Sequence, residues 1–443
     1  MTEIDLEKLN RNRILIKEVF SSKKKEVEIA GWVHNTRNLS KVKFLVLRDI
    51  SGIVQVTGVN GKTEDKIFEM MDKLSRESVV YVKGSLKDSK QAPGGKEINP
   101  SELVVISEAE SLPIDVSEHS KTELPKRLDY RCLSLRTKRS QAIFKVQSKI
   151  VEGMQNWLNK NNFQQVFTPC LMGVPSESGA EAFEVKYFNK KAFLRQDPQL
   201  HRQLTVLGGI EKLYDIGPSW RAEKSNTIKH MTEHRTCAVE LAFIDDEQDT
   251  MRVEEQMIVS AIQNVLDTCQ EELDFLEVKL KVPKTPFPEL RFPEIYDILK
   301  KEGKDIYGED LDAEAEKILW EYVKKNYKSD FYFFNKFPHR IKPFYVMGDN
   351  NSEWARSVDL NFKGMEMSSG GQREHRYDKL MKNVKERKMS LKSVEWFTKF
   401  FKYGVPPHGG FALGIERFTQ MLLDIPNIRE ATLFPRDPDR TTP

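Results

Sequence analysis

Alternating apolar and polar residues divide the first part of the chain into short strands. The runs lie at 27–33, 44–49, 53–57, 79–84 and 102–107, and a helical period covers 66–74. A two-residue period is typical of strands with one buried face. Five short strands and one helix within about 85 residues predict a small Greek-key β-barrel of the oligonucleotide-binding (OB) type, with an unrelated small β domain as the alternative.

The rest of the chain combines long amphipathic helices with many strand-like runs. Apolar residues recur at helical spacing from Ser140 to Trp157 and again over 251–265. Between and beyond these helices we expect strands at 165–167, 192–194, 212–216, 239–243, 331–334, 344–347 and 357–360. Long helices and grouped strands without regular β–α alternation predict an α+β fold with a mostly antiparallel sheet.

These patterns predict a division into two domains. We expect the barrel domain at 1–110, with a short polar N-terminal extension, and the second domain at 139–443. Residues 111–138 are expected to form an irregular hinge linker between them. The charged, mixed segment 284–330 is expected to be an insertion into the second domain.

Composition narrows the class of protein. Of 443 residues, 39% are hydrophobic and 31% are charged, which supports folded cores and excludes a disordered chain. No apolar run approaches the ~18 residues of a membrane span, and the N-terminus lacks the apolar stretch of a secretory signal. Four scattered cysteines suggest no disulfide framework, so we expect a cytoplasmic protein. A net charge of +3 does not by itself indicate a nucleic-acid partner.

Two stretches carry candidate chemistry. In the first, Arg221 and Glu223 alternate on a predicted strand and share a face, and His230 follows. A guanidinium suits a phosphate and a carboxylate suits an amine, although a surface ion pair is the simpler interpretation of so short a stretch. In the second, Gly409-Gly410-Phe411-Ala412-Leu413-Gly414 precedes a helix that carries Arg417. Glycines there let the backbone approach a ligand, but a lone glycine-rich run is a weak signal.

Taken in this order, and with Pro169 upstream after a long helix, the two stretches resemble the signature motifs of the class II aminoacyl-tRNA synthetases. Over essentially its whole length the chain resembles the aspartyl-tRNA synthetases of the archaeal and eukaryotic-cytosolic type. The resemblance implies an anticodon-binding OB barrel and a class II catalytic domain whose antiparallel sheet is flanked by helices. The segments that carry it are 31–33, 44, 47–49, 52 and 55 in the barrel, then 177–179, 196–200, 362–375 and 433–438.

The resemblance implies a two-step ligase reaction with ATP and Mg²⁺ as cofactors. The α-carboxylate of L-aspartate attacks the α-phosphate of ATP, which gives aspartyl-adenylate and pyrophosphate, and the 3′-terminal ribose of a tRNA then takes the aspartyl group. Such chemistry depends on positioning and charge neutralisation more than on a protein base. Arg221 is the expected catalytic residue at the α-phosphate, and Arg417 the one at the γ-phosphate and adenine. The full expected ATP site is Arg221, Glu223, His230, Glu366, Gly414 and Arg417.

The same resemblance implies sites for the metal and the amino acid. Oxygen ligands suit Mg²⁺, although Asp359 could instead cap a strand. Arg373 is expected to grip the side-chain carboxylate of aspartate, with Glu177 and Gln199 at the α-amino end. The expected Mg²⁺ ligands are Asp359, Glu366 and Ser369, and the expected aspartate-binding residues are Glu177, Gln199, Arg202, Ser369 and Arg373.

The resemblance also implies macromolecular partners. Within the family, members that accept only tRNA-Asp resemble each other in a Trp at the position of His34 and a Lys in the last barrel loop, whereas a His and a Pro/Gly-containing loop look like the members that accept tRNA-Asn as well. This chain has His34 and the loop 91–96, so we expect both tRNAs, with an ordinary exposed residue and a plain turn as the alternative. The expected anticodon contacts are His34, Phe44, Gln55 and Pro93.

A homodimer is expected across Ser140–Pro169. Within this range Ile143, Ile150, Met154 and Trp157 form an apolar stripe, which the pattern alone assigns equally well to a core.

Four positions of the expected pocket depart from the family pattern. Arg202 stands where the family usually has Lys, Asp197 where it has Ser, Ala238 where it has Asp, and His234 where many members have an aromatic residue. Asp197 adds a carboxylate and Ala238 removes one, so the change is consistent with one relocated negative charge. The alternatives are a divergent paralogue with altered amino-acid preference or no tRNA charging, a non-catalytic nucleic-acid-binding protein, and an asparaginyl-tRNA synthetase or asparagine synthetase of the same fold.

Overall fold

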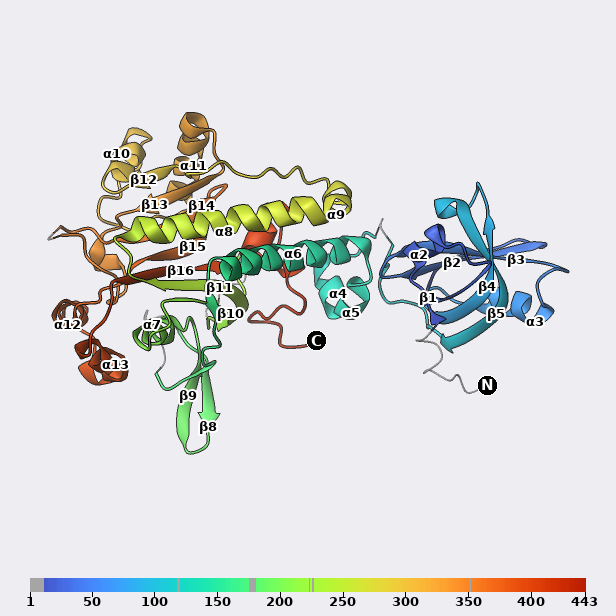
Figure 1. Ribbon diagram of the computed structural model, residues 1–443, viewed down its shortest axis with the longest axis horizontal. Coiled ribbons are helices and arrows are strands. Elements are labelled where there is room, and N and C mark those ends of the chain that lie inside the picture. The colour runs from blue at the N-terminus through green and yellow to red at the C-terminus, as the bar shows by residue number, and fades with distance from the viewer. Residues whose placement is uncertain (1–11, 118–119, 175–180, 223, 225–226, 351) are drawn as a thin grey trace. The chain divides into compact units, whose positions relative to one another are not determined.

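A computed structural model describes residues 12–117, 120–174, 181–222, 224, 227–350 and 352–443. The chain forms two compact units, Met1–Asp115 and Val116–Pro443 (Figure 1). In the described part of the chain, no helix has the length and apolar character needed to cross a membrane.

The first unit is a closed five-stranded barrel with the strand order β1-β2-β3-β5-β4. All neighbouring strands are antiparallel except β3 and β5. Every second residue of β2 is buried, which confirms the alternation expected from the sequence. The predicted helix between the third and fourth strands is also confirmed. The elements are α2 (Ile16–Ser21), β1 (Glu26–Asn38), β2 (Val42–Asp49), β3 (Gly52–Val59), α3 (Asp65–Lys73), β4 (Val79–Asp88), η1 (Pro93–Gly95) and β5 (Lys96–Ser107).

The second unit is built on an eight-stranded sheet with the order β12-β13-β14-β15-β16-β11-β10-β6. Its strand pairs are antiparallel except β12 with β13 and β10 with β6, so the predicted mostly antiparallel sheet is confirmed and is mixed at its two edges. The strands are β6 (Gln164–Gln165), β10 (Lys212–Trp220), β11 (Glu233–Ala242), β12 (Glu289–Arg291), β13 (Phe331–Asn335), β14 (Ser357–Phe362), β15 (Met365–Gln372) and β16 (His408–Gly414). A separate three-stranded sheet holds β7 (Leu171–Met172), β8 (Glu184–Tyr187) and β9 (Lys190–Leu194).

Two long helices, α6 (Lys138–Lys160) and α8 (Glu247–Thr268), lie side by side on one face of this sheet (Figure 1). Each begins at an N-cap residue whose side chain accepts a backbone N–H: Thr137 accepts from Ser140, and Asp246 accepts from Gln248. Ile143, Ile150 and Met154 of α6 are fully buried in the core between these helices and the sheet. Three of the four residues of the stripe expected at a dimer interface therefore lie in the core of a single chain, and the fourth, Trp157, packs against this core while only partly buried.

The remaining helices surround the sheet. Residues 111–138, expected to be irregular, hold two short helices instead, and the buried Arg131 of the second donates hydrogen bonds to the carbonyls of Thr432 and Leu433. Residues 344–347, expected to be a strand, form a turn with one isolated bridge at Val346. The helices are α4 (Leu124–Asp129), α5 (Arg131–Ser134), α7 (Gln199–Leu207), α9 (Gln270–Phe275), α10 (Glu294–Lys301), α11 (Ala313–Tyr327), η2 (His339–Ile341), α12 (Tyr377–Glu386), α13 (Leu391–Thr398), η3 (Lys399–Lys402), α14 (Ile415–Leu422) and η4 (Ile428–Ala431).

The segment 284–330 extends the sheet and adds a small core of its own. Its strand β12 pairs with β13, and its helices α10 and α11 pack on the ring side chains of Tyr332 and Phe334. These two residues point away from the face that carries α6 and α8, because successive strand residues alternate.

Candidate active site

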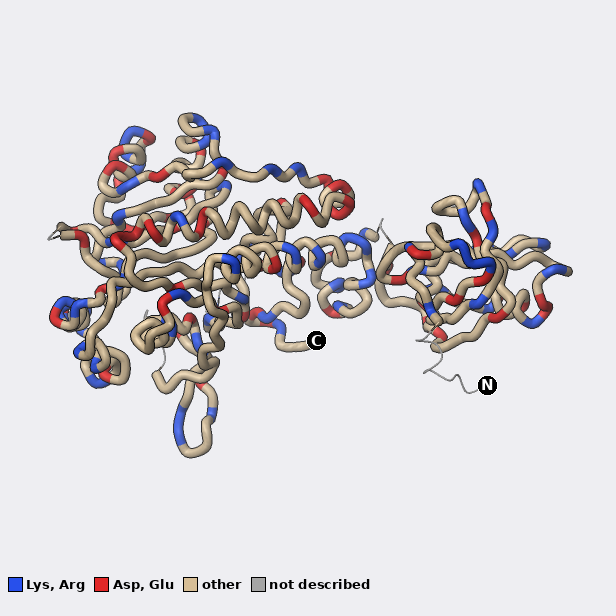
Figure 2. The backbone as a smooth tube through the Cα atoms, viewed as in Figure 1, with Lys and Arg blue, Asp and Glu red and all other residues tan. Residues whose placement is uncertain are grey.

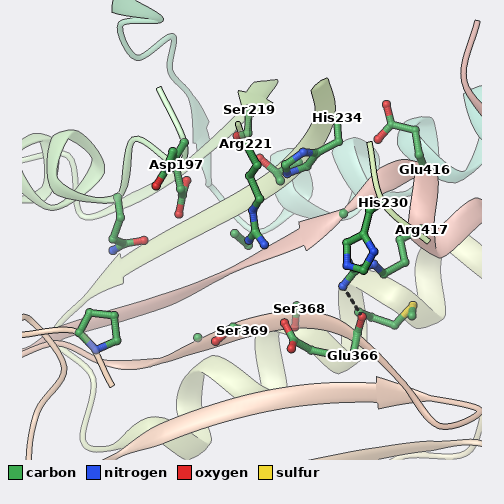
Figure 3. A pocket seen from close by; sticks show the side chains of 18 of the residues that line it. Asp197, Ser219, Arg221, His230, His234, Glu366, Ser368, Ser369, Glu416 and Arg417 are labelled. Atoms are coloured by element: carbon green, nitrogen blue, oxygen red, sulfur yellow. Dashed lines mark hydrogen bonds between the residues drawn. The ribbon is translucent and has the colours of Figure 1, made fainter. Parts of the chain in front are cut away.

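A pocket lies on the face of the sheet opposite α6 and α8. Along β11, Cys237 and Val239 belong to the core beneath the two helices, whereas His234 and Thr236 line the pocket. Figure 3 shows Asp197 toward one end of this pocket and His230, Glu416 and Arg417 toward the other, with Arg221 between them. Further lining residues named in the sequence prediction are Gln199, Glu366, Ser369, Arg373 and Gly414.

Two arginines line the pocket at α14 and between its two ends. Arg221 follows β10, and Arg417, on the first turn of α14, donates from Nη1 to the carbonyl of Glu366 (3.0 Å). Burial and these two arginines lower the pKa of His234 to about 3, so its imidazole is neutral near pH 7. His230 places Nδ1 2.6 Å from the hydroxyl of Thr227. The predicted Glu223 lies outside the described residues.

A β-bulge brings the predicted metal ligands onto one face. Asp359 of β14 lies directly opposite Ser369 of β15, and the register then shifts, so that Asn361 lies opposite Glu366. The extra residue at the bulge lets Glu366 and Ser369, three positions apart, both line the pocket. Ser368 points the other way and donates to the buried carboxyl of Glu254 on α8.

The two carboxylates at this bulge are only partly compensated by nearby positive charge. Burial and the neighbouring Asp359 raise the pKa of Glu366. Asp359 is 6% exposed; its Oδ2 accepts from Lys342 Nζ (3.0 Å), while its Oδ1 is buried and finds no hydrogen-bond partner among the residues described. Repulsion and an orphaned oxygen acceptor are what a bound divalent cation would relieve, so these residues fit Mg²⁺.

The protein does not form a complete metal cage here. Over the described ranges, no group of three or more His, Cys, Asp or Glu side chains could hold a metal ion. A cation at Asp359 and Glu366 would therefore draw its other ligands from water and from the oxygen atoms of a substrate, as Mg²⁺ commonly does beside phosphates.

Opposite charges alternate along a buried chain of hydrogen bonds at the other end of the pocket. Arg373 donates from Nε to Glu240 Oε1 (2.9 Å), and Gln199 donates from Nε2 to Glu240 Oε2 (3.0 Å). Arg202 donates from Nη2 to Gln199 Oε1 (2.7 Å). Its Nη1 and Nη2 also donate to Oδ1 and Oδ2 of Asp197, at 2.7 and 2.8 Å. The result is one connected network from Asp197 to Arg373.

Glycine at position 410 makes this network possible. A Cβ atom there would clash first with the backbone carbonyl of Val239 and would lie 2.5 Å from Oε2 of Glu240, so a side chain would disturb both the strand and the carboxylate. At Gly414 the nearest atom to such a Cβ is Cβ of Arg417, at 3.7 Å, and the residue lines the pocket. Of the two glycines, only Gly414 lines the pocket, and its contact with a ligand stays a prediction.

The structure corrects one predicted aspartate contact, and another lies outside the described residues. Arg202 is 0% exposed and both its Nη atoms are taken by Asp197 and Gln199, so the expected contact with a substrate carboxylate is not available to it. Ala238 is buried within β11. Glu177, expected at the α-amino end, lies outside the described residues, whereas Gln199 and Arg373 are at the pocket wall as expected.

Sequence reasoning missed three charged residues of this region. Glu240 had a signal, because it is a lone charge between Val239 and Leu241 in a buried strand. Lys342, which pairs with Asp359, had none. Glu316 of α11 is close enough to interact with Glu366: burial, and then the charge of Glu366, raise the pKa of Glu316 to about 7. Its helix belongs to the segment 284–330, which was expected to be only an insertion.

The four predicted residues of the barrel lie on β1, on the neighbouring strands β2 and β3, and on η1. Phe44 and Gln55 are on the half-buried outer faces of the paired strands β2 and β3. His34, at a bulge of β1, places Nδ1 2.9 Å from Nη1 of Arg48 on β2. Pro93 begins η1, which contacts β3. Gln55 itself donates to Glu97 Oε2 (3.0 Å) of β5.

The sequence matches two protein families. Residues 123–438 match the tRNA synthetases of class II (D, K and N), and residues 27–106 match the OB-fold nucleic-acid-binding domain. An "Aspartate–tRNA(Asp) ligase" of Thermococcus kodakarensis is 42% identical over 94% of this chain and 96% of the relative. An "Aspartate–tRNA(Asp/Asn) ligase" of Methanopyrus kandleri is 39% identical over 94% of this chain and 96% of that relative.

Solved structures agree over nearly the whole length. An asparaginyl-tRNA synthetase of Pyrococcus horikoshii, complexed with asparaginyl-adenylate, has a TM-score of 0.90 and 35% identity over 98% of this chain and all of that one. An aspartyl tRNA synthetase of Entamoeba histolytica has a TM-score of 0.88 and 28% identity, over 100% of this chain and 95% of that one.

Proposed function

The chain belongs to the class II aminoacyl-tRNA synthetases, among the aspartate–tRNA ligases, and we propose that it attaches L-aspartate to tRNA-Asp, and also to tRNA-Asn, through an aspartyl-adenylate. The observation that carries the proposal is one pocket whose two ends hold different sets of charged groups. Arginines and a pair of carboxylates suit ATP at one end, and the network from Asp197 to Arg373 suits a small charged amino acid at the other.

The first step needs charge neutralisation at the α-phosphate. Arg221 lies between the two ends of the pocket (Figure 3), so its guanidinium is our choice for the α-phosphate, where negative charge grows as the aspartate carboxylate attacks. Arg417 would hold the far end of ATP. The neutral ring of His234 would offer the adenine ring of ATP a surface to pack on without adding charge.

Asp359 and Glu366, with Ser369 beside them, would hold Mg²⁺, which supplies charge dispersal on the phosphates when bound. Lys342 already neutralises one oxygen of Asp359. Arg221 would hold the α-phosphate, and Arg373 would hold the aspartate through its side-chain carboxylate. With both substrates fixed in one pocket, attack by the α-carboxylate becomes effectively unimolecular.

We propose a separation of tasks between the two parts of the chain. Residues 1–110 would read the anticodon and 139–443 would catalyse. The segment 111–138, expected to be a hinge, belongs mostly to the second unit, which begins at Val116 and holds Arg131 by hydrogen bonds. His34 and the Pro/Gly-containing loop 91–96 support acceptance of both tRNAs, and so do relatives named for both substrates. Aspartyl-tRNA-Asn would then be the substrate of an amidotransferase.

We also propose a homodimer and a cytoplasmic location. With most of the α6 stripe buried, the dimer surface would lie around Pro169, where Phe167 is 83% exposed and Leu171 46%. Four free cysteines, two of them exposed, suit a reducing compartment. Sedimentation at micromolar concentration should give twice the 51.4 kDa of one chain, and a species of single-chain mass would refute the dimer.

The function is tested by ATP–pyrophosphate exchange with each of the twenty amino acids and no tRNA. L-Aspartate alone should support exchange; exchange with L-asparagine instead, or with none, would refute the proposal. Charging of both tRNA transcripts then tests tRNA choice. A preference for tRNA-Asp above about a hundredfold, ~2.7 kcal/mol, would refute acceptance of tRNA-Asn.

A further inference from the structure

Among the described residues, Asp197 is the one acidic residue that lines the pocket at the end where Arg373 lies. The other acidic lining residues, Glu366 and Glu416, are at the opposite end (Figure 3). Glu240 belongs to the network but is 0% exposed, so it cannot meet a ligand. The side chain of Asp197, by contrast, is 38% exposed.

Arg202 fixes the orientation of this carboxylate. Two parallel N–H donors on two carboxylate oxygens form a bidentate pair, which sets the plane of the acceptor as well as its distance. Arg202 is itself immobilised, since it is fully buried and also donates to Gln199. Each oxygen of Asp197 uses one lone pair on Arg202 and keeps acceptor capacity for a further donor.

Arg373 is held in a complementary way. Its Nε and Nη2 donors are directed at the two oxygens of Glu240, at 2.9 and 3.4 Å, and this leaves the Nη1 side of the guanidinium fork for a ligand. The two ends of the network thus offer an oriented anion and an oriented cation on one wall of the pocket.

We infer that Asp197 accepts the α-ammonium group of the amino-acid substrate, and that Arg202 is a positioning residue that acts only through Asp197. The inference rests on the proposed function, because it assigns the amino-acid end of the same pocket. An ammonium has three donors and no acceptor, so a carboxylate with free acceptor capacity is a suitable partner that also balances its charge. The α-amino group is thereby selected at one end of the network while Arg373 selects the side-chain carboxylate at the other.

The test compares L-aspartate with L-malate, which keeps both carboxylates and replaces the ammonium with a hydroxyl. The KM of L-aspartate and the inhibition constant of L-malate are measured in tRNA-free pyrophosphate exchange. In Asp197→Asn we expect the KM to rise at least thirtyfold and the L-malate constant to change less than threefold. Equal weakening of both ligands, or no change in either, would overturn the inference.

Asp197→Asn leaves Arg202 buried without its counter-charge and risks misfolding. The double variant Asp197→Asn with Arg202→Gln removes both charges and should show the same selective loss of L-aspartate. Because Arg202 acts through Asp197, Arg202→Gln alone should weaken L-aspartate selectively, and the double variant should be no worse than Asp197→Asn. Additive losses, or a loss of L-malate affinity in the double variant, would refute the positioning role.

Asp249→Asn is the matched control, since Asp249 pairs with Arg252 on the outer part of α8 (3.0 Å), away from the pocket. It should leave both constants unchanged. Absence of aspartate-dependent exchange in the wild type would refute the proposed function. Normal wild-type exchange with an unchanged ligand ratio in the variants would refute only the role of Asp197.

Discussion

The pocket network and the outer face of the barrel hold their polar residues in opposite ways. In the network, Arg202 and Glu240 are fully buried and each meets two partners, so neither can change alone without leaving an unpaired charge. On the barrel, Phe44 and Gln55 are half-buried on a strand surface, where substitutions usually cost little stability. The difference suggests that amino-acid choice is structurally fixed in this chain, whereas tRNA choice is open to adjustment.

The largest effect should come from the phosphate end of the pocket. Arg221→Ala should lower the rate of L-aspartate-dependent pyrophosphate exchange by about 10²–10³-fold, ~3–4 kcal/mol, because a preorganised cation at the developing charge is lost. Arg252→Ala, on the exposed side of α8, is the matched control and should retain the wild-type rate. A loss of less than tenfold in Arg221→Ala would mean that another group neutralises the α-phosphate.

The second effect concerns stability beneath the same sheet. Burial raises the pKa of Glu254 to about 8, from an ordinary value near 4.5. The folded chain therefore keeps a proton that the unfolded chain releases, and stability should fall as pH rises from about 4.5 to 8. Glu254→Gln removes this loss, so the free energy of unfolding should drop less between pH 5 and pH 8 than in the wild type.

Between pH 5 and pH 8 the free energy of unfolding should drop by at least ~1.4 kcal/mol less in Glu254→Gln than in the wild type, which is the value of one pKa unit. Urea titrations at both pH values measure it, with Glu271→Gln at an exposed position of α9 as the control. Identical pH dependence in wild type and Glu254→Gln would show that Glu254 is ionised in the folded chain.

The smallest effect should come from the barrel surface. His34→Trp removes the contact with Arg48 and places a bulky indole at the bulge of β1. We expect the preference for tRNA-Asp over tRNA-Asn, measured as the ratio of kcat/KM for the two transcripts, to rise about threefold to tenfold, up to ~1.4 kcal/mol. An unchanged ratio would remove His34 from the determinants of tRNA choice.

Much of the fold followed from periodicity. The five barrel strands, the long helices α6 and α8, and the mostly antiparallel sheet were all predictable, because each buries one face and so repeats at a fixed period. The strand expected at 344–347 was wrong because its apolar residues fill a turn: Phe344 packs on α12 and α13 rather than in the sheet.

The candidate site was predictable where motifs are local and not where partners are distant. Arg221, Glu366, Ser369 and Arg417 meet in one pocket as expected. The change of Arg202 from ligand contact to buried partner was not predictable, because its hydrogen bonds depend on where Asp197 and Gln199 lie in three dimensions. The same holds for Glu240, whose space is created by Gly410 on a neighbouring strand, 170 positions later in the sequence.

The central claim is that aspartate activation and tRNA choice reside in different parts of the chain, and Gln55→Ala tests it most directly. The variant is assayed in one preparation for tRNA-free pyrophosphate exchange and for charging of tRNA-Asp, with Gln263→Ala on α8 as the control. We predict exchange within twofold of the wild type and charging reduced about tenfold, ~1.4 kcal/mol, because Gln55 lies on the outer face of the barrel. Equal loss in both assays would contradict the separation of the two tasks.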